Sequence, residues 1–396
     1  MFTFTKKFLN LHANSYANIF ANNYTNGMTR LVNCIRPDGT LIYADKFCTP
    51  SYVFTYPSSF DSKNGTMIYD SDINSHIMVH PCNPMLTNCY ESYLMDNHDS
   101  PISFARIPKK SVVIGYNQCA YAELNLTNIA NNDILICRRT TGGGAVYLDE
   151  KQILFGIVGN NKKVSRDAFI DVIVKFIKKK FGYDAIPTGK NDISVDGKKV
   201  AGLAYKSSGD KNLCHACILI SSEIDIMEQY LTPNKIKTDY HCIKSIDKRV
   251  QNLAKRPKDM CDMSDYCLEI TNIFKKEFYG SETIGETQYL HESDLFVVAD
   301  QFNKINNINF ILRKNKDKTN ASHFAKKFDN LGFFEIYLFF DNEKRIKDIH
   351  CNTDFLDIKF PENLSNFILN KKITEIHLDN PDNNINIVIE FIKSNY

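Results

Sequence analysis

The chain has 396 residues, 43% of them hydrophobic, and its 48 Lys and Arg residues nearly balance its 46 Asp and Glu residues, for a net charge of +2. This length accommodates two or three domains of about 100–200 residues each. A charge so close to zero gives no global field that would attract nucleic acid or an anionic membrane, and neither is an expected partner. No apolar run approaches the ~18 residues that a membrane-spanning helix needs.

The amino-terminal stretch has an unusual composition. Residues 1–37 contain no Asp or Glu, and their charge comes from Lys and Arg set among Ser, Thr, Asn and apolar residues. This composition is typical of a mitochondrial transit segment. The alternative is an Asn-rich leader on a protein that stays in the cytoplasm. Residues 38–75 form an N-terminal extension to which the sequence assigns no role.

Residues 76–294 alternate strand-like and helix-like patterns, as a mixed α/β domain does. We expect a helix over 85–97 and a buried strand over 111–115. Two more short apolar runs, at 133–137 and 153–158, bracket three consecutive glycines. The glycines are therefore predicted to lie on a loop between strands.

The clearest predicted helix follows. Apolar residues recur at helical spacing from Phe169 to Ile177, with Ser165 as a candidate N-cap and Gly182 as a candidate C-cap. An Asp-Gly pair then separates strands at 193–195 and 198–202, which predicts a tight hairpin.

The remaining elements complete the expected fold class, α/β or α+β. We expect a strand over 213–221, a short helix over 224–231, and a charged helical region from 255 to about 294. Residues 295–396 are interpreted as a small α+β domain, whose main strands flank an Asp-Asn turn at 341–342. The principal sheet is predicted to be antiparallel or mixed.

Three consecutive glycines at 142–144 are compatible with several kinds of site. A dinucleotide site is disfavoured because the spacing is not G-x-G-x-x-G and Ala145–Tyr147 continues as a strand. A P-loop is disfavoured because the Gly-Lys pair at 189–190 lacks both the upstream glycine and the following Ser or Thr. The remaining functional interpretation is that backbone N–H groups approach phosphate or an acyl chain, with Arg138 and Arg139 supplying charge. A purely structural loop is the alternative.

Four blocks taken together resemble lipoate-protein ligases in residue type, order and spacing. The blocks are Arg138-Arg139-Thr140-Thr141-Gly142-Gly143-Gly144-Ala145-Val146, Gly189-Lys190-Asn191-Asp192, Gly197-Lys198-Lys199-Val200-Ala201-Gly202, and Ile243-Lys244-Ser245 with Arg249-Val250-x-Asn252-Leu253. The resemblance implies the lipoate/biotin protein ligase fold: a mixed sheet flanked by helices in a catalytic domain over 76–294, and a small α+β accessory domain over 295–396.

The same resemblance implies a two-step reaction. Lipoate and ATP, with magnesium, would give lipoyl-adenylate and pyrophosphate, and the adenylate would then acylate a lysine of a lipoyl domain. The implied acceptors are the lipoyl domains of 2-oxoacid dehydrogenase complexes or the glycine-cleavage H protein. The protein is expected to act as a monomer.

Lys199 matches the family's catalytic lysine, and a fixed ammonium there could stabilise charge on the carboxylate and α-phosphate oxygens as it develops. Asp192 is also the implied ligand of magnesium. Alternatives remain for single residues: Lys199 as a solvated lysine, Asp192 as a turn residue, and His215 as a core histidine. The residues that the resemblance assigns to nucleotide and lipoate binding are Arg139, Gly142, Gly143, Gly144, Ala145, Val146, Tyr147, Asn191, Asp192, Lys199, Gly202 and His215.

The chain also departs from the family. Where the family commonly has His-Asp-x-Gly-Asn after the glycine block, this chain has Leu148-Asp149-Glu150-Lys151-Gln152. If the missing His and Asn order the nucleotide, adenylation is impaired and only transfer of a preformed lipoyl-adenylate remains.

Two further alternatives concern the reaction as a whole. One is a cofactor-free lipoyl or octanoyl transferase that uses Cys214 or Cys217 as a thiolate. The other is a non-catalytic scaffold that binds a lipoylated partner.

As a metal site the Cys-x-x-Cys pair is disfavoured, because no second pair has zinc-site spacing and residues three apart on a strand face opposite sides. The 12 cysteines are scattered, and we expect reduced thiols of an intracellular protein.

Overall fold

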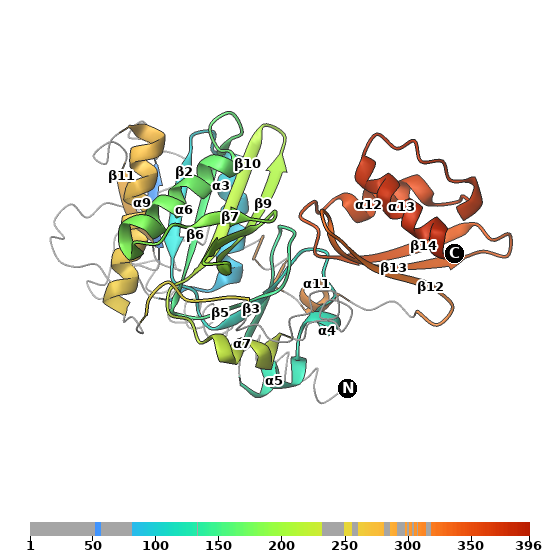
Figure 1. Ribbon diagram of the computed structural model, residues 1–396, viewed down its shortest axis with the longest axis horizontal. Helices are drawn as coiled ribbons and strands as arrows, with labels where there is room; N and C mark the ends of the chain where they lie inside the picture. The colour runs from blue at the N-terminus through green and yellow to red at the C-terminus, as the bar shows by residue number, and fades with distance from the viewer. Residues whose placement is uncertain are drawn as a thin grey trace, which may run out of the picture.

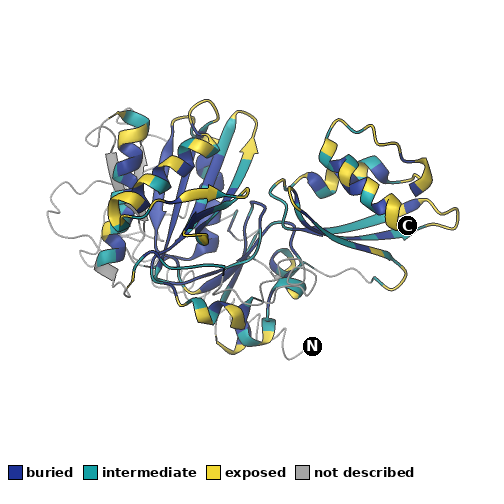
Figure 2. Cartoon of the chain, in the orientation of Figure 1, coloured by how far each residue is buried: buried dark blue, intermediate teal, exposed yellow. Residues whose placement is uncertain are grey.

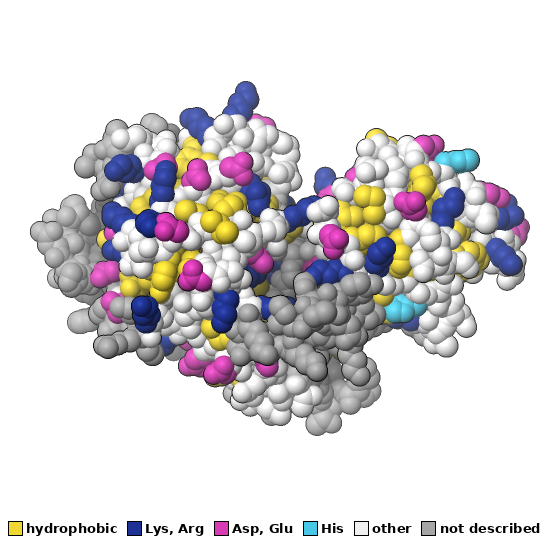
Figure 3. All heavy atoms as spheres, viewed as in Figure 1, with side chains coloured by type: hydrophobic (Ala, Val, Ile, Leu, Met, Phe, Trp, Pro, Cys, Tyr) yellow, Lys and Arg dark blue, Asp and Glu magenta, His cyan; other side chains and the backbone are white. Residues whose placement is uncertain are grey.

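The computed structural model describes residues 52–56, 81–132, 134–231, 249–255, 260–280, 286–290, 298, 301–302, 305–306, 308–313 and 318–396. The predicted transit segment, almost all of the N-terminal extension, and the block Ile243-Lys244-Ser245 lie outside these residues. Among the helices described, none combines the length and the apolar character needed to cross a membrane. On the face seen in Figure 3, basic and acidic side chains are interspersed, in keeping with the near-zero net charge.

An eight-stranded sheet forms the centre of the catalytic part, in the order β11-β1-β2-β6-β10-β9-β8-β7 (Figure 1). Every neighbouring pair is antiparallel, so the prediction of an antiparallel or mixed sheet is confirmed. The strands are β1 (Tyr52–Tyr56), β2 (Ile102–Arg106), β6 (Gln152–Asn160), β7 (Ile186–Thr188), β8 (Asp192–Val195), β9 (Lys198–Ser208), β10 (Lys211–Leu219) and β11 (Glu286–Leu290).

Helices α6 (Arg166–Phe181) and α9 (Met260–Tyr279) cover one face of this sheet. The α6 prediction is confirmed at both ends: the Ser165 side chain accepts a hydrogen bond from the Ala168 N–H, and Gly182 ends the helix at φ 78°. The helical spacing of the apolar residues turns one stripe of α6 inward, where its side chains join a cluster of buried residues from the sheet and α9. Figure 2 shows this contrast between the buried inner side and the exposed outer side of α6.

The region after α9 differs from its prediction. The charged helical pattern was expected to run from 255 to about 294, but the helix ends at Tyr279 and Gly280 follows at φ 76°. Residues 286–290 then form the edge strand β11, which pairs with β1. A glycine in the left-handed region ends a helix, and pairing with a distant strand overrides local propensity.

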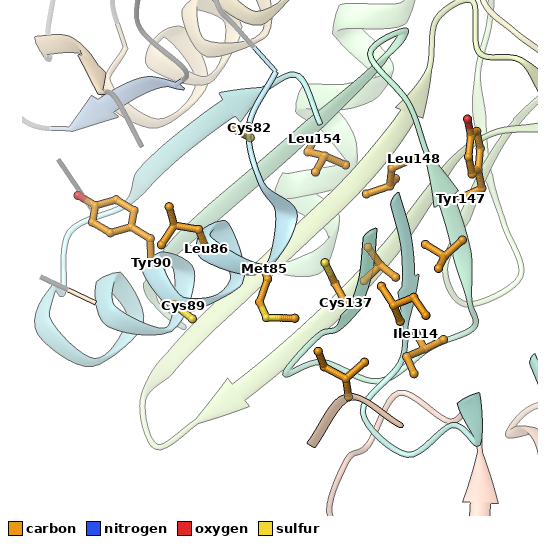
Figure 4. Close-up of a cluster of buried hydrophobic side chains, with 14 of the residues drawn as sticks. Cys82, Met85, Leu86, Cys89, Tyr90, Ile114, Cys137, Tyr147, Leu148 and Leu154 are labelled. Atoms are coloured by element: carbon orange, nitrogen blue, oxygen red, sulfur yellow. The ribbon is translucent and has the colours of Figure 1, made fainter. Parts of the chain in front are cut away.

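The opposite face of the large sheet is covered by α3 (Pro84–Asn97) and a second, three-stranded sheet in the order β4-β3-β5. In this sheet β3 (Ser111–Ile114) pairs parallel with β4 (Leu135–Arg138) and antiparallel with β5 (Val146–Leu148). Figure 4 shows apolar side chains from these elements gathered in one buried cluster. The three glycines lie between β4 and β5, as the prediction of a loop between strands required.

Short helices complete this side: α4 (Ala120–Glu123), α5 (Leu126–Asn131), α7 (Ile224–Tyr230) and α11 (Ile308–Leu312). Val298, Phe302 and Ile311 belong to the same buried cluster as α3 and the second sheet. By their packing these residues join the catalytic part, although they lie beyond the predicted domain boundary at 294.

The C-terminal part is a three-stranded antiparallel sheet with two helices on one face (Figure 1). It has a hydrophobic cluster of its own, separate from the two clusters of the catalytic part. The predicted strand at 332–340 is present, and the turn after it leads into its antiparallel partner. The elements are β12 (Ser322–Phe328), β13 (Gly332–Phe340), β14 (Ile346–Thr353), α12 (Phe360–Ile368), a 3₁₀ turn (Ile373–Glu375) and α13 (Asn383–Asn395).

Candidate active site

The glycine loop is held by the side chain of Arg139. Its guanidinium donates to the Gly142 carbonyl from Nε at 3.0 Å and Nη2 at 2.7 Å, and to the Gly144 carbonyl at 2.8 Å. Burial lowers the pKa of Arg139 to about 10. Gly143 adopts φ +95°, and a Cβ there would come within 2.8 Å of Nη2 of Arg139. The arginine and the glycines thus form one unit, in which the fork of donors fixes the loop from inside.

The side chain of Arg138 makes different contacts from that of Arg139. It is fully buried and donates to the carbonyls of Gly115, Tyr116 and Gln118 on one side and of Phe310 and Ile311 on the other. Burial lowers its pKa to about 9. Since its partners are all backbone carbonyls, Arg138 ties the loop after β3 to α11.

Gly142 is the point at which the C-terminal part touches this loop. A Cβ at Gly142 would lie 2.3 Å from the Phe355 carbonyl oxygen and 2.6 Å from the Leu356 Cα. Nearby, Asn117 accepts from the Thr353 N–H at 3.1 Å and donates through Nδ2 to the Ile358 carbonyl at 2.9 Å. The segment that follows β14 therefore packs directly on the glycine loop.

Lys199 follows the predicted hairpin turn, in which Asp196 and Gly197 both have positive φ. Its Nζ lies 2.7 Å from Oδ1 of Asp192. A Cβ at Gly202 would approach that Nζ to 2.8 Å, so the absence of a side chain at 202 leaves the space that the lysine occupies. Backbone hydrogen bonds join Lys199 to the segment beginning at Arg249, which fixes the strand on its other side.

A buried polar chain runs from α3 to the glycine loop. The Glu91 carboxylate accepts from Nη2 of Arg106 at 2.5 Å and lies 2.8 Å from Nδ1 of His215, and Nε2 of His215 lies 3.0 Å from the Thr141 hydroxyl. Burial disfavours the charged form of Glu91, but His215 and then Arg106 act against it, and the pKa of this carboxyl is lowered. The chain connects His215, a predicted site residue, to the loop that carries the glycines.

A cavity of about 140 Å³ lies between the large sheet, α3 and the glycine loop. Of the predicted site residues, eight line it: Arg139, Gly144, Ala145, Val146, Asn191, Lys199, Gly202 and His215. Four do not. Gly142 packs against Phe355 and Leu356, and Gly143 packs against Arg139. Asp192 contacts the cavity-lining Lys199, and Tyr147 stacks on Tyr230 with centroids 5.6 Å apart. The sequence did not single out the lining residues Asn88, Arg106 and Leu154.

Comparison with known proteins identifies the family. Residues 84–275 match the Lipoyl protein ligase A/B catalytic domain. A probable lipoate-protein ligase A of Mycoplasma pneumoniae is 30% identical over 265 residues, which cover 63% of this chain and 72% of that protein. The chain belongs to the lipoate-protein ligase family. Lipoate–protein ligase 1 of Plasmodium falciparum is 37% identical over 186 residues, 47% of this chain and 44% of that protein.

A solved structure shows the same fold. The crystal structure of P. falciparum LipL1 in complex with lipoate superposes with a TM-score of 0.65 at 26% identity, covering 79% of this chain and 97% of the other. The predicted fold class, a lipoate-ligase-like catalytic part with a small C-terminal α+β part, is thus confirmed.

The two cysteines of the Cys-x-x-Cys pair face opposite sides of β10, as strand geometry requires. Cys214 is buried against the helical side, and burial raises the pKa of its thiol to about 12. Cys217 lines the cavity beside Gly202, with its Sγ 3.7 Å from the Gly202 carbonyl. Within the part of the chain that the structure describes, no group of three or more His, Cys, Asp and Glu side chains could hold a metal ion.

The two residues that depart from the family pattern have distinct surroundings. Leu148 is buried and adds apolar surface to the cavity wall. Gln152 is fully buried away from the cavity, where Nε2 donates to the Tyr147 carbonyl at 3.1 Å and the Ser222 hydroxyl at 2.9 Å. Gln152 therefore stabilises the turn between β5 and β6.

Proposed function

We propose that this protein is an ATP-dependent lipoate-protein ligase, which converts lipoate to lipoyl-adenylate and transfers the lipoyl group to a lysine of a lipoyl domain. The observation that carries the proposal is the position of the Lys199 ammonium at one end of the cavity. The apolar side chains of Val113, Leu148 and Leu154 are among the residues that line the same cavity. A cation at the end of an apolar pocket suits an acid whose carboxylate is charged and whose chain is not.

In the first step, a carboxylate oxygen of lipoate attacks the α-phosphorus of ATP and pyrophosphate leaves. In the second step, the amine of the acceptor lysine attacks the acyl carbonyl and AMP leaves. Negative charge gathers on oxygen in both steps, and the Lys199 ammonium can stabilise it without forming a covalent bond. In the free protein Asp192 balances this cation at 2.7 Å, and the incoming carboxylate would compete with Asp192 for it.

Magnesium would accompany ATP. Mg²⁺ is usually held by one or two carboxylates together with substrate phosphates. Asp192 is the predicted carboxylate, and its partner Lys199 lines the cavity beside Asn191. One carboxylate with the phosphates therefore fits the ion, which would partly neutralise the charge of the triphosphate.

The acceptor and the location of the reaction belong to the same proposal. The acceptors would be lipoyl domains of 2-oxoacid dehydrogenase complexes or the glycine-cleavage H protein. The protein would act on them as a monomer. The composition of residues 1–37 supports a mitochondrial site of action.

The test is mass spectrometry of an apo lipoyl domain incubated with the full chain under three conditions: lipoate with ATP and magnesium, lipoyl-adenylate alone, and an octanoyl carrier protein. Lipoylation in the first condition supports the proposal. Lipoylation by the adenylate alone, without the first, indicates that the activation step is lost. If none of the three conditions modifies the acceptor, the protein is not a ligase or a transferase of this kind.

A second candidate, the ATP-independent transferase, rests on Cys217, which lines the cavity beside Gly202. Its thiolate would attack the thioester of an acyl carrier and release the carrier thiol, and the acceptor lysine would then displace Cys217 from the acyl group. Octanoylation in the third condition that disappears in a Cys217→Ala variant would select this candidate. The matched control is Cys214→Ala, because that thiol lies on the far face of the same strand.

A further inference from the structure

Four adjacent strands each contribute one residue to a single row across the cavity floor. Arg106 on β2 pairs with Leu154 on β6, Leu154 pairs with Cys217 on β10, and Cys217 pairs with Gly202 on β9. All four residues line the cavity. Neighbouring strands lie about 4.8 Å apart, so three spacings separate the two ends of the row by roughly 14 Å. Lys199 stands over the Gly202 end, and Arg106 marks the opposite end.

Arg106 is an unusual residue for the far end of an acyl pocket. It is 97% buried, and only its Nη2 donates to a described partner, the Glu91 carboxylate. Its Nε and Nη1 are buried and have no hydrogen-bond partner among the residues that the structure describes. Donors buried without an acceptor are costly, and they are expected to find one in a ligand.

The charge of Arg106 limits what that ligand group can be. Glu91 already balances the guanidinium at 2.5 Å, so a second carboxylate would bring excess negative charge into a buried place. A neutral atom with lone pairs fits the two unpaired donor nitrogens better. The carboxylate of the substrate is in any case expected at the other end of the row, beside Lys199.

We infer that Arg106 recognises the dithiolane sulfur atoms at the far end of lipoate and makes this site prefer lipoate to octanoate. The inference rests on the proposed function, because it takes an acyl chain to lie along the row. Thioether-like sulfur is a weak hydrogen-bond acceptor, whereas a methyl group accepts nothing. Octanoate would therefore leave both donor nitrogens unpaired, whereas lipoate offers them an acceptor. Sites that offer a buried donor discriminate against ligands that lack the acceptor.

The experiment is isothermal titration calorimetry of the full chain with lipoate and with octanoate, in the absence of ATP. We expect lipoate to bind the wild type at least about tenfold more tightly than octanoate, a ratio within reach of one desolvated donor pair. Arg106→Lys keeps a cation for Glu91 but has a single nitrogen in place of the guanidinium, and it should bring the ratio close to one by weakening lipoate. Arg345→Lys, at an exposed arginine of the C-terminal part, is the matched control and should leave the ratio unchanged.

A second variant covers the case in which R106K does not fold, judged by far-ultraviolet circular dichroism. The double variant E91Q/R106M removes both charges together, which buried pairs tolerate far better than the loss of one partner. It should also bind the two acids equally. Equal binding of both acids by the wild type, or an unchanged ratio in R106K or E91Q/R106M, overturns the inference and leaves the proposed function standing. If the wild type binds neither acid, the proposed function fails and the inference fails with it.

Discussion

The two faces of the large sheet are built from the same strands but have opposite character. On the helical side, alternate residues such as Phe155 of β6 and Cys214 of β10 pack into a hydrophobic cluster. The side chains of His215 on β10 and of Arg106 at the end of β2 face the cavity side instead, and both contact Glu91. A strand turns successive side chains to opposite faces, and each strand therefore stabilises the fold with one set of residues and forms the site with the other. The mutations below test how independent the two sets are.

The largest effect is expected at the cavity face. Lys199→Ala should lower the rate of lipoyl-adenylate formation by at least about 10²–10³-fold, the usual loss when one group that stabilises developing charge is removed. The rate is measured as pyrophosphate release with lipoate and ATP. Lys198→Ala changes the exposed neighbour and should keep the wild-type rate. A Lys199→Ala protein with full activity would exclude the proposed role of this lysine.

A substitution on the helical face of the sheet should change the stability of the fold instead of the reaction rate. Phe155 is fully buried and stacks on Phe169 of α6 with centroids 5.6 Å apart, so Phe155→Ala should cost about 3–5 kcal/mol in the free energy of unfolding. Urea denaturation measures this loss. The ratio of lipoate to octanoate affinity should stay at the wild-type value in whatever fraction remains folded. A change in that ratio would mean that the two faces are coupled through the sheet.

The glycine loop offers a matched pair of substitutions. Gly142→Ala should destabilise the protein by about 1–3 kcal/mol, because the new Cβ collides with the backbone of Phe355 and Leu356. Gly144→Ala meets nothing within 4 Å and should change stability by no more than about 0.5 kcal/mol. Thermal unfolding of both variants side by side tests the contact between the loop and the C-terminal part. Equal effects at the two positions would contradict it.

The smallest expected effect is on the loss of stability at acid pH. The pKa of Glu91 is lower in the folded protein than the ordinary value of 4.5, so the stability it contributes is present above that value and is lost as pH falls through the folded pKa. Below pH 4.5 the loss amounts to about 1.4 kcal/mol per pH unit until Glu91 is protonated in the folded state. Urea denaturation of the wild type and of Glu91→Gln at pH 7 and pH 4 should show a flatter acid dependence in the variant. Parallel curves would show that Glu91 does not titrate in this way.

Local signals allowed much of the fold to be predicted. The caps of α6 at Ser165 and Gly182, the Asp196-Gly197 hairpin and the loop position of the glycines depend on neighbouring residues, and each is present. The edge strand at 286–290 was missed because its formation depends on pairing with β1, which is more than two hundred residues away in the chain.

The site was predictable only in part, for a related reason. Lys199 and the glycines belong to contiguous motifs, whereas Arg106 reaches the cavity only through the register of four strands. No local pattern around Arg106 distinguishes it from an ordinary strand-end arginine. The same holds for the contact of Glu91 with His215, which are separated by 124 positions. Tyr147, predicted to contact nucleotide, packs on Tyr230 instead of lining the cavity.

The close approach of the backbone at Gly142 limits how the sequences of related chains can diverge. Position 142 lies in the glycine block, and the backbone that excludes a side chain there belongs to residues 355 and 356, in the C-terminal part. A larger residue at 142 therefore requires a compensating rearrangement more than two hundred positions away. The two segments should be inherited as a matched pair, and exchanging the C-terminal part between distant relatives should fail unless the glycine loop is exchanged with it.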